Sequence, residues 1–182
     1  MIKYILLGFL NYSRMTGYEL KQNIDNSTAH FWHAHHSQIY TTLREMEKDG
    51  LVTSQYIQEQ GQPDRRIYTI SETGKQSLID WLNHPMVEAS SIKEEFLVRI
   101  FFSAQRDPKK VIAELLVQRE QHQKQLDVYE SILHPFIDEN ASVEAGLARE
   151  SAFWHATLKM GIQYEKMYLD WITNTIQNIE AL

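Results

Sequence analysis

The segment from residue 36 to residue 50 combines hydrogen-bonding and positively charged side chains at helical spacing. Ile39, Leu43 and Met46 lie at positions i, i+4 and i+7, so a helix through them turns one apolar face toward a core. At about 100° per residue, the opposite face carries hydroxyl, amide and cationic groups. These are Ser37, Thr41, Arg44 and Lys48, with Gln38 and Tyr40 flanking them. Such groups can pair with base edges and phosphates of DNA, whereas a merely solvated helix face is the alternative.

The elements that precede this segment are predicted from apolar spacing and from helix start signals. A first helix is expected over residues 2–10. A second helix begins at Thr16, which forms a capping-box pair with Glu19. The third helix begins near residue 36 or 37 and ends at Gly50, because glycine suits the left-handed conformation just past a helix end.

After the third helix the pattern becomes strand-like. Residues 51–57 and 65–70 are rich in β-branched and aromatic residues. The segment between them contains Gly61 and Pro63, which predicts a β-hairpin.

A fourth helix is expected over residues 71–85, with a serine cap at its start and a proline at its end. It should carry Leu78, Ile79 and Leu82 inward. Three helices, a hairpin and a helix follow one another in the order of a winged helix-turn-helix, so residues 1–85 are predicted to form a DNA-binding domain of that type. The fold class is therefore mainly α with a small β-hairpin.

In a helix-turn-helix the recognition helix enters the major groove with its N-terminal residues against base edges. These residues are Ser37, Gln38 and Thr41, of which Gln38 can pair bidentately with adenine. Phosphate contacts, which fix register, are expected from a second set. That set is Tyr40, Arg44, Lys48, Arg65 and Arg66. The hairpin tip over residues 61–66, with Gln62, is the predicted wing.

Five sequence blocks support this interpretation. They are Thr16-Gly17-Tyr18-Glu19-Leu20, Phe31-Trp32, Ser37-Gln38-Ile39-Tyr40 with Leu43, Glu47-Lys48-Asp49-Gly50-Leu51-Val52, and Tyr68-Thr69-Ile70-Ser71-Glu72-Thr73-Gly74-Lys75. In order and spacing they resemble the PadR family of bacterial transcriptional regulators. The second half resembles, more loosely, the C-terminal dimerisation domain of the subgroup with a virulence-activator-like tail. The stretch 93–96 resembles the start of that tail.

The resemblance implies a winged-helix homodimer that binds an inverted repeat in double-stranded DNA, with phenolic acid-responsive repression as the family's namesake activity. It assigns Ser37, Gln38 and Tyr40 to the recognition-helix motif and residues 61–66 to the wing. The family commonly has proline after the tyrosine of this helix, and this chain has Thr41. We therefore expect the base preference to differ.

Residues 90–182 show no strand signal and are predicted to form a helical dimerisation domain. Ser91 with Glu94 is a capping box, and Asp107 before Pro108 marks the start of a helix of about 37 Å that runs to residue 132. The last helix, residues 146–179, carries one apolar stripe. Two long amphipathic helices with nothing else to cover them predict a homodimer.

The same half contains candidate contacts for a small aromatic acid effector. Heptad spacing along the stripe of residues 115–133 puts Arg119 and His122 on the inward line. A buried polar group needs a partner, so these two side chains pair with acids across the dimer or line a cavity, and an interhelical polar contact is the favoured role. Trp154 and His155 add aromatic surface, with core packing as the alternative. From the first domain, the predicted contributors are Tyr18, Phe31 and Trp32.

Four histidines cluster near the third helix. They are His30, His33, His35 and His36, of which the last three could donate imidazoles to a transition metal, but the chain has no cysteine and the cluster has no companion carboxylate. Capping or phosphate contact is the favoured role for them. We therefore expect no metal and no cofactor.

Composition limits the remaining classes. The 182 residues carry a net charge of −6, of which −1 falls on residues 1–85 and −5 on residues 86–182, so only a local face can be positive. Phosphate loops, G-x-S-x-G, H-E-x-x-H and cysteine nucleophiles are missing, which predicts a protein that is not an enzyme. The sequence shows no membrane span and no signal-peptide pattern, so we expect a cytoplasmic protein. An effector-independent regulator, an activator and a helical protein-interaction module remain alternatives to an effector-released repressor.

Overall fold

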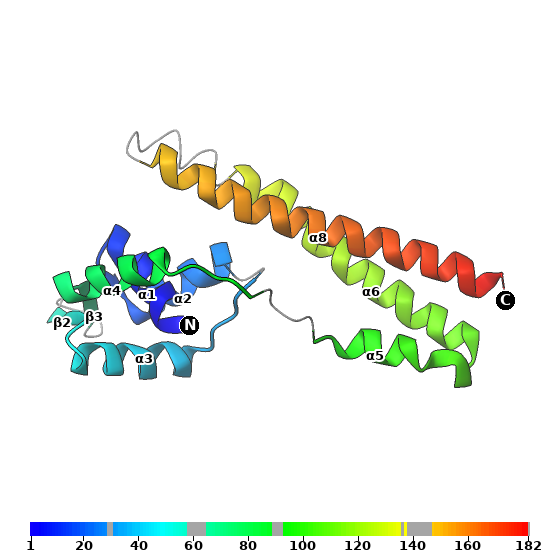
Figure 1. Cartoon of the computed structure of the whole chain (residues 1–182), viewed down its shortest axis with the longest axis horizontal. Helices are drawn as coiled ribbons and strands as arrows, with labels where there is room; N and C mark the ends of the chain where they lie inside the picture. Colours follow the sequence, from blue (N-terminus) through cyan, green and yellow to red (C-terminus); the bar gives the residue numbers. More distant parts are fainter. Residues whose placement is uncertain (29–30, 58–64, 89–92, 136, 138–146, 182) are drawn as a thin grey trace. The chain divides into compact units, whose positions relative to one another are not determined.

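The computed structural model describes residues 1–28, 31–57, 65–88, 93–135, 137 and 147–181. The chain divides into two compact units, Met1–Ala89 and Ser90–Leu182 (Figure 1). Each unit has its own hydrophobic core, and each is described by itself.

The first unit begins with three helices: α1 (Ile2–Tyr12), α2 (Gly17–Asn23) and α3 (His36–Lys48). The predicted capping box at the start of α2 is confirmed, because Thr16 Oγ1 accepts from the backbone N–H of Glu19 at 3.1 Å and the Glu19 carboxylate accepts from the Thr16 N–H at 2.7 Å. A π-helical turn over Ile24–Thr28 follows α2. The termination of α3 before Gly50 is also confirmed, and Gly50 has a φ of 71°.

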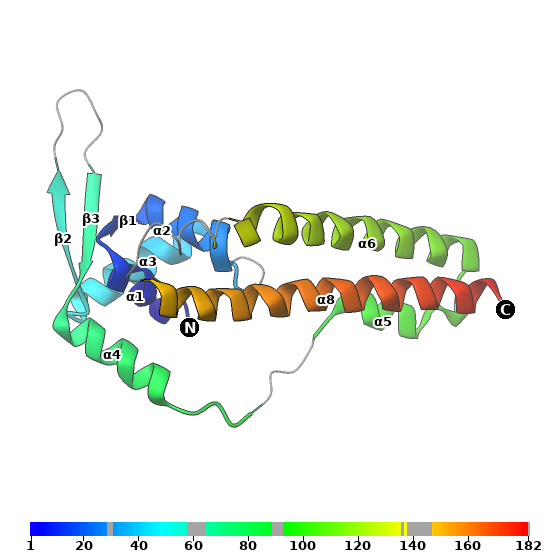
Figure 2. The ribbon, with the colours of Figure 1, turned by 90° about the horizontal axis from the view of Figure 1, so that it is seen from above.

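The predicted hairpin is present as β2 (Val52–Ile57) and β3 (Arg65–Ile70), paired antiparallel from Val52 opposite Ile70 to Ile57 opposite Arg65 (Figure 2). The residues of the expected tip before Arg65, Gln62 among them, lie outside the described residues. A two-residue strand, β1 (Met15–Thr16), pairs with the other edge of β3, so the sheet order is β1-β3-β2. The sequence pattern did not predict β1, because two residues are too few to show alternation.

The fourth helix, α4 (Glu72–Asn83), corrects one prediction. Leu78 is buried, but Ile79 and Leu82 are 49% and 65% exposed. The inward line runs instead through Gly74, Leu78 and Trp81, because at Gly74 the helix lies so close to Leu51 and Ile70 that a side chain would not fit.

The core of the first unit joins α1, α2 and α3 to the sheet and α4. Its fully buried side chains include Leu6, Leu7, Leu20, Ile24, Ile39 and Leu43. Burial of such side chains contributes about 1.5–3 kcal/mol each relative to exposure, so this core holds α3 in place. The polar face of α3 is therefore presented on a fixed support.

The second unit consists of α5 (Glu95–Phe101), a 3-10 turn (Ser103–Gln105), α6 (Pro108–Val128), a π-helical turn (Tyr129–Leu133) and α8 (Ala148–Glu180). The predicted cap of α6 is confirmed, since Asp107 accepts from the Lys109 N–H at 3.0 Å and Pro108 occupies the first turn. The expected cap Ser91 lies outside the described residues. Glu94 immediately precedes α5, so this helix begins three residues later than a cap at position 91 would place it.

Helices α6 and α8 lie side by side along their length, in agreement in both views (Figures 1 and 2). Ser151, Leu158, Glu165 and Ile172 repeat every seven residues on α8 and are all buried. This spacing is typical of a helix that packs along one partner helix. No helix in the described part of the chain has a long enough apolar stretch to cross a membrane.

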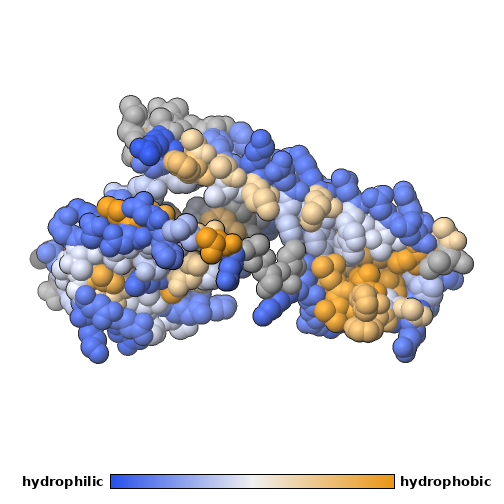
Figure 3. Space-filling view, in the orientation of Figure 1, coloured by the Kyte–Doolittle hydropathy of each residue, from blue (hydrophilic) through white to orange (hydrophobic). Residues whose placement is uncertain are grey.

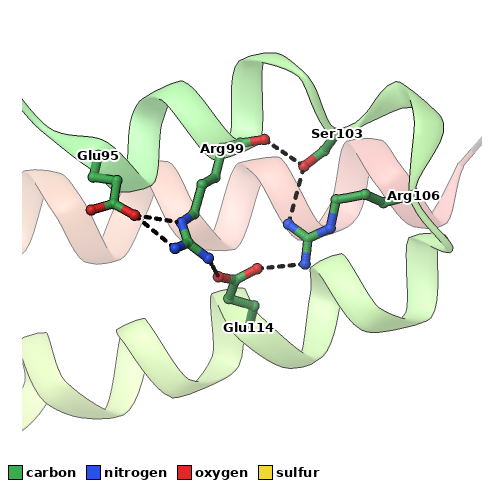
Figure 4. Close-up of polar contacts among 5 residues, drawn as sticks. All are labelled: Glu95, Arg99, Ser103, Arg106 and Glu114. Carbon is green, nitrogen blue, oxygen red and sulfur yellow. Dashed lines mark hydrogen bonds and ion pairs between the residues drawn. The ribbon is translucent and has the colours of Figure 1, made fainter.

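Helix α5 is tied to α6 by a polar network (Figure 4). Arg99 donates to Glu95 on its own helix and lies 3.8 Å from the Glu114 carboxylate on α6. Arg106 donates to the other Glu114 oxygen at 2.6 Å. Glu114 on α6 thus contacts both Arg99 on α5 and Arg106, which follows the 3-10 turn between the two helices.

Candidate nucleic-acid interface

The face of α3 opposite the core carries the predicted contact residues. Ile39, Leu43 and Met46 are 0%, 0% and 1% exposed, which confirms the predicted core face of this helix. The side chains on the opposite face are all exposed. They are Ser37, Gln38, Tyr40, Thr41, Arg44 and Lys48. The helix therefore presents amide, hydroxyl, phenolic and cationic groups on one surface.

Gln38 has a second role at the start of α3. Its Oε1 accepts from the backbone N–H of His35 at 3.1 Å, which satisfies one of the N–H groups left unpaired at a helix start. The Gln38 side chain is exposed, and its oxygen keeps a second lone pair beside the two donors of its NH₂ group, so it could still pair with a base edge.

Contacts with α2 and within α3 hold the side chains of Tyr40 and Arg44 in place. A Cβ added at Gly17 on α2 would lie 2.5 Å from Tyr40 Cε1, so the phenol ring packs directly on the α2 backbone. Arg44 donates to the Tyr40 carbonyl at 3.3 Å and to Thr41 Oγ1 at 3.4 Å. These contacts hold the Arg44 guanidinium along the exposed face.

The two wing arginines differ in their surroundings. Arg65 is exposed at the end of β3 nearest the hairpin tip. Arg66 is 30% exposed and donates to Glu47 on α3 and to Ser54 on β2. Glu47 and Ser54 were not among the predicted site residues, because an acid in the last helical turn and a serine in a strand carry no motif.

An open crevice of about 490 Å³ lies beside the N-terminal half of α3. It is lined by Met1, Ile2, Trp32, His33, Ser37, Gln38, Thr41 and Thr42. Three predicted base-contact residues thus share this crevice with one predicted effector residue, Trp32.

The other predicted effector residues of the first unit are on its surface. Tyr18 is 58% exposed and its hydroxyl accepts from Gln22 Nε2 at 3.2 Å. Phe31 is 55% exposed.

In the second unit, Arg119 does not lie on the inward line of α6 as predicted, whereas His122 does. Arg119 is exposed, because the inward line of α6 steps from Leu115 to half-buried Gln118 and then to His122. His122 is 17% exposed and its Nδ1 lies 2.5 Å from Glu165 Oε2 on α8, so it makes the interhelical polar contact. Glu165 was not predicted, although it lies on the heptad line of α8.

Trp154 and His155 are half-buried on α8. The His155 ring centroid is 5.1 Å from that of His134. These side chains belong to the second unit, and Tyr18, Phe31 and Trp32 to the first.

Of the histidine cluster, the structure describes His33, His35 and His36. Within the ranges that the structure describes, no three His, Cys, Asp or Glu side chains are grouped as metal ligands. The His36 ring lies parallel to that of Tyr40 at 6.5 Å, and His30 lies outside those ranges.

Comparison with known proteins gives two family matches that together span most of the chain. Residues 6–80 match the transcriptional regulator PadR-like family, and residues 92–180 match the virulence activator alpha C-terminal family. The probable transcriptional regulator Rv1176c of Mycobacterium tuberculosis is 28% identical over 91% of this chain and 90% of its own. The negative transcriptional regulator PadR of Bacillus subtilis is 25% identical over 99% of this chain and 98% of its own.

Solved structures of the Bacillus subtilis PadR have the same fold. Its complex with operator DNA gives a TM-score of 0.84 at 22% identity, covering 98% of this chain and 97% of that one. Its complex with p-coumaric acid gives a TM-score of 0.75 at 22% identity, covering 98% of both chains.

The fold and the polar face of α3 define a winged-helix protein of the class that regulates transcription. The first unit, over residues 6–80, belongs to the PadR-like family of transcriptional regulators. The matching proteins are regulators and not enzymes, which confirms that expectation for this chain.

Proposed function

We propose that the chain is a homodimeric repressor that binds an inverted-repeat operator and is released by a small aromatic acid. The observation that carries DNA binding is the polar face of α3, exposed along its whole length while Ile39, Leu43 and Met46 anchor the opposite face. The first unit would bind DNA and the second would dimerise. In a two-fold dimer the two α3 helices would reach half-sites about 34 Å apart, or a multiple of that distance.

Contacts on α3 divide into two kinds. Ser37, Gln38 and Thr41, in the N-terminal half, would meet base edges and set sequence preference. Tyr40, Arg44 and Lys48 would meet phosphates and fix register. Gln38→Ala should relax sequence preference, whereas Arg44→Ala should weaken all fragments similarly and lower the salt slope by about 0.9 for one lost phosphate contact.

The second unit supports the dimer. Leu97, Val98, Phe101 and Phe102 are 38%, 56%, 80% and 67% exposed, and an apolar patch covers α5 (Figure 3). Phe101 and Phe102 pack edge to face at 4.9 Å. A second copy would cover this patch. Phe101→Glu with Phe102→Glu should therefore give a monomer in light scattering, while Met160→Glu, at a 65% exposed position on α8, is the comparison variant.

Effector release is supported by the B. subtilis PadR, whose structure holds p-coumaric acid. In this chain an aromatic acid would contact Trp32 in the crevice of the first unit. The second-unit candidates His122, Trp154 and His155 stay a prediction. A ligand that entered the crevice beside α3 would touch Ser37, Gln38 and Thr41 as well. Such a ligand and DNA would exclude each other directly.

The decisive experiment is fluorescence anisotropy of labelled DNA from upstream of the chain's own gene and its neighbours. Salt-dependent binding that a hydroxycinnamic acid reverses supports the full proposal. Binding without reversal leaves an effector-independent regulator, and reporter expression in cells with and without the gene separates repression from activation. Failure to bind any fragment, including a selected pool of palindromes, contradicts the proposal and favours a protein-interaction module.

A further inference from the structure

The last turn of α3 is joined to both strands of the hairpin by Glu47, Ser54 and Arg66. Ser54 Oγ donates to Glu47 Oε1 at 2.5 Å. Arg66 donates through Nε to Ser54 Oγ at 2.9 Å and through Nη2 to Glu47 Oε2. The three residues form a closed ring of hydrogen bonds that connects α3, β2 and β3.

The ring neutralises the arginine locally. Arg66 and Glu47 are 30% and 31% exposed. The hydrogen bond from Ser54, together with the one from Arg66, holds the pKa of Glu47 below its ordinary value against the opposing effect of burial. The Arg66 guanidinium also lies 5.2 Å from the ring of Tyr56 and 5.3 Å from that of Tyr68, at cation–π distance. Its charge and its Nε and Nη2 donors are thus engaged by groups of the protein.

This arrangement matters for the geometry of the surface. Ladder hydrogen bonds hold β2 to β3, but they do not fix the angle between the hairpin and α3. Beyond Ile67 and Tyr68, which pair with β1, the hairpin is a two-stranded ribbon. Such a ribbon is strongly twisted and has few neighbours, so its direction needs side-chain contacts. The ring supplies such contacts at the point where α3 ends.

We propose that Glu47 is a positioning residue that holds the hairpin at a fixed angle to α3 through Ser54 and Arg66. Arg66 then orients the hairpin and does not neutralise a phosphate. This inference rests on the proposed function, in which α3 and the hairpin bind DNA together. It revises the sequence-based expectation that Arg66 contacts phosphate.

The direction in which DNA affinity changes on replacing Glu47 tests the inference. Removing an acid from a surface that faces DNA should strengthen binding, because repulsion of the phosphates is lost. Glu47→Ala should instead weaken DNA binding about tenfold, by the same factor as Arg66→Ala, and the double variant should be no weaker than either single one. Glu45→Ala, an exposed acid two residues earlier on α3, is the matched control and should bind as tightly as the wild-type chain or more tightly.

The salt dependence separates the two roles of Arg66. With Arg66→Ala the salt slope should stay at the wild-type value, whereas Arg44→Ala should lower it by about 0.9. Arg66→Lys keeps the charge but lacks the planar fork, so it should lose affinity as Arg66→Ala does. Glu47→Gln can still accept from Arg66 and should stay within about threefold of wild type, which guards against a misfolded alanine variant.

A urea-unfolding cycle of Glu47→Ala and Arg66→Ala, without DNA, should show positive coupling between the two residues. Tighter DNA binding by Glu47→Ala, a lowered salt slope for Arg66→Ala, wild-type affinity for Arg66→Lys, or additive urea effects would each overturn the positioning role. If the wild-type chain bound no DNA, the proposed function would fail, and the urea cycle would still report on the ring itself.

Discussion

The phenol ring of Tyr40 on α3 rests on the backbone of Gly17 at the start of α2. A Cβ at position 17 would lie 2.5 Å from Tyr40 Cε1 and 2.9 Å from Tyr40 Cζ. This contact leaves Tyr40 42% exposed on the face predicted to meet DNA. The direction of the phenol is thus set by the absence of a side chain on another helix.

We predict that Gly17→Ala weakens DNA binding with little loss of stability. The ring can swing outward at small cost because it is half exposed, so the free energy of unfolding should change by less than about 1 kcal/mol. Anisotropy titration and thermal melting measure the two effects. Gly8→Ala, at a position with nothing within 4 Å of the added Cβ, is the control. It should stabilise α1 by about 0.5–1 kcal/mol without affecting DNA binding. Unchanged affinity of Gly17→Ala would contradict a role for the Tyr40 direction.

Gly74→Ala should strongly destabilise the first unit. The added Cβ would lie 2.1 Å from the backbone oxygen of Leu51 and 2.9 Å from Ile70 Cγ1, and a backbone atom cannot turn aside as a side chain can. A cost of about 3 kcal/mol is expected from overpacking. Hydrogen exchange read separately over the two units should show loss of protection in the first unit only. Equal protection in variant and wild type would be inconsistent with this close packing.

The pair of His122 and Glu165 should contribute to the stability of the second unit. The Glu165 side chain is 8% exposed and His122 17%, so His122→Ala leaves a buried carboxylate without this partner. We expect a loss of about 2–3 kcal/mol in urea unfolding, and less than about 1 kcal/mol for Glu165→Gln, which keeps a hydrogen bond. Replacing both residues, by His122→Phe and Glu165→Leu, should be close to neutral. Gln121→Ala, at the exposed neighbouring position, is the control. If His122→Ala lowered the free energy of unfolding no more than Gln121→Ala does, the result would contradict a stabilising pair.

Alkaline pH should destabilise the second unit. Burial, and then the Glu165 carboxylate, raise the pKa of Tyr129 from 10.0 to about 12. Burial and the hydrogen bond to Glu94 also raise the pKa of Tyr168. A raised pKa means that the folded chain retains its proton longer than the unfolded chain, so this stability is complete below pH 10.0 and is lost as pH rises toward about 12.

The measurement is the free energy of unfolding across that pH range, with tyrosinate absorbance as a second signal. Tyr129→Phe should make the dependence shallower. Tyr18→Phe, at a 58% exposed site in the first unit, should leave it unchanged. An identical pH dependence in Tyr129→Phe and wild type would contradict the assignment.

Part of the candidate site followed from the sequence, and part did not. The polar face of α3 was predictable because Ile39, Leu43 and Met46 fix the helix rotation within a single helix. The ring through Arg66 was not, since Glu47 lies 19 residues away in the chain and its partner cannot be read from spacing. The apolar residues Ile79 and Leu82 were expected inside and lie outside, because Gly74 sets the line of contact for α4.

The sequence by itself determined where α2, α3 and α6 begin, where the two hairpin strands lie, and that the first unit is a winged helix. These features depend on interactions between residues a few positions apart, such as the capping box of Thr16 and Glu19. Tertiary structure decided which side chains meet across elements. His122 pairs with Glu165 from 43 residues away, and Arg119 faces solvent because α6 turns Gln118 inward in its place. Whether Gln118 or Arg119 faces inward changes the local energy of the helix little, since both residues are compatible with helical structure. The packing of α6 on α8 therefore decides which of the two side chains faces the partner helix.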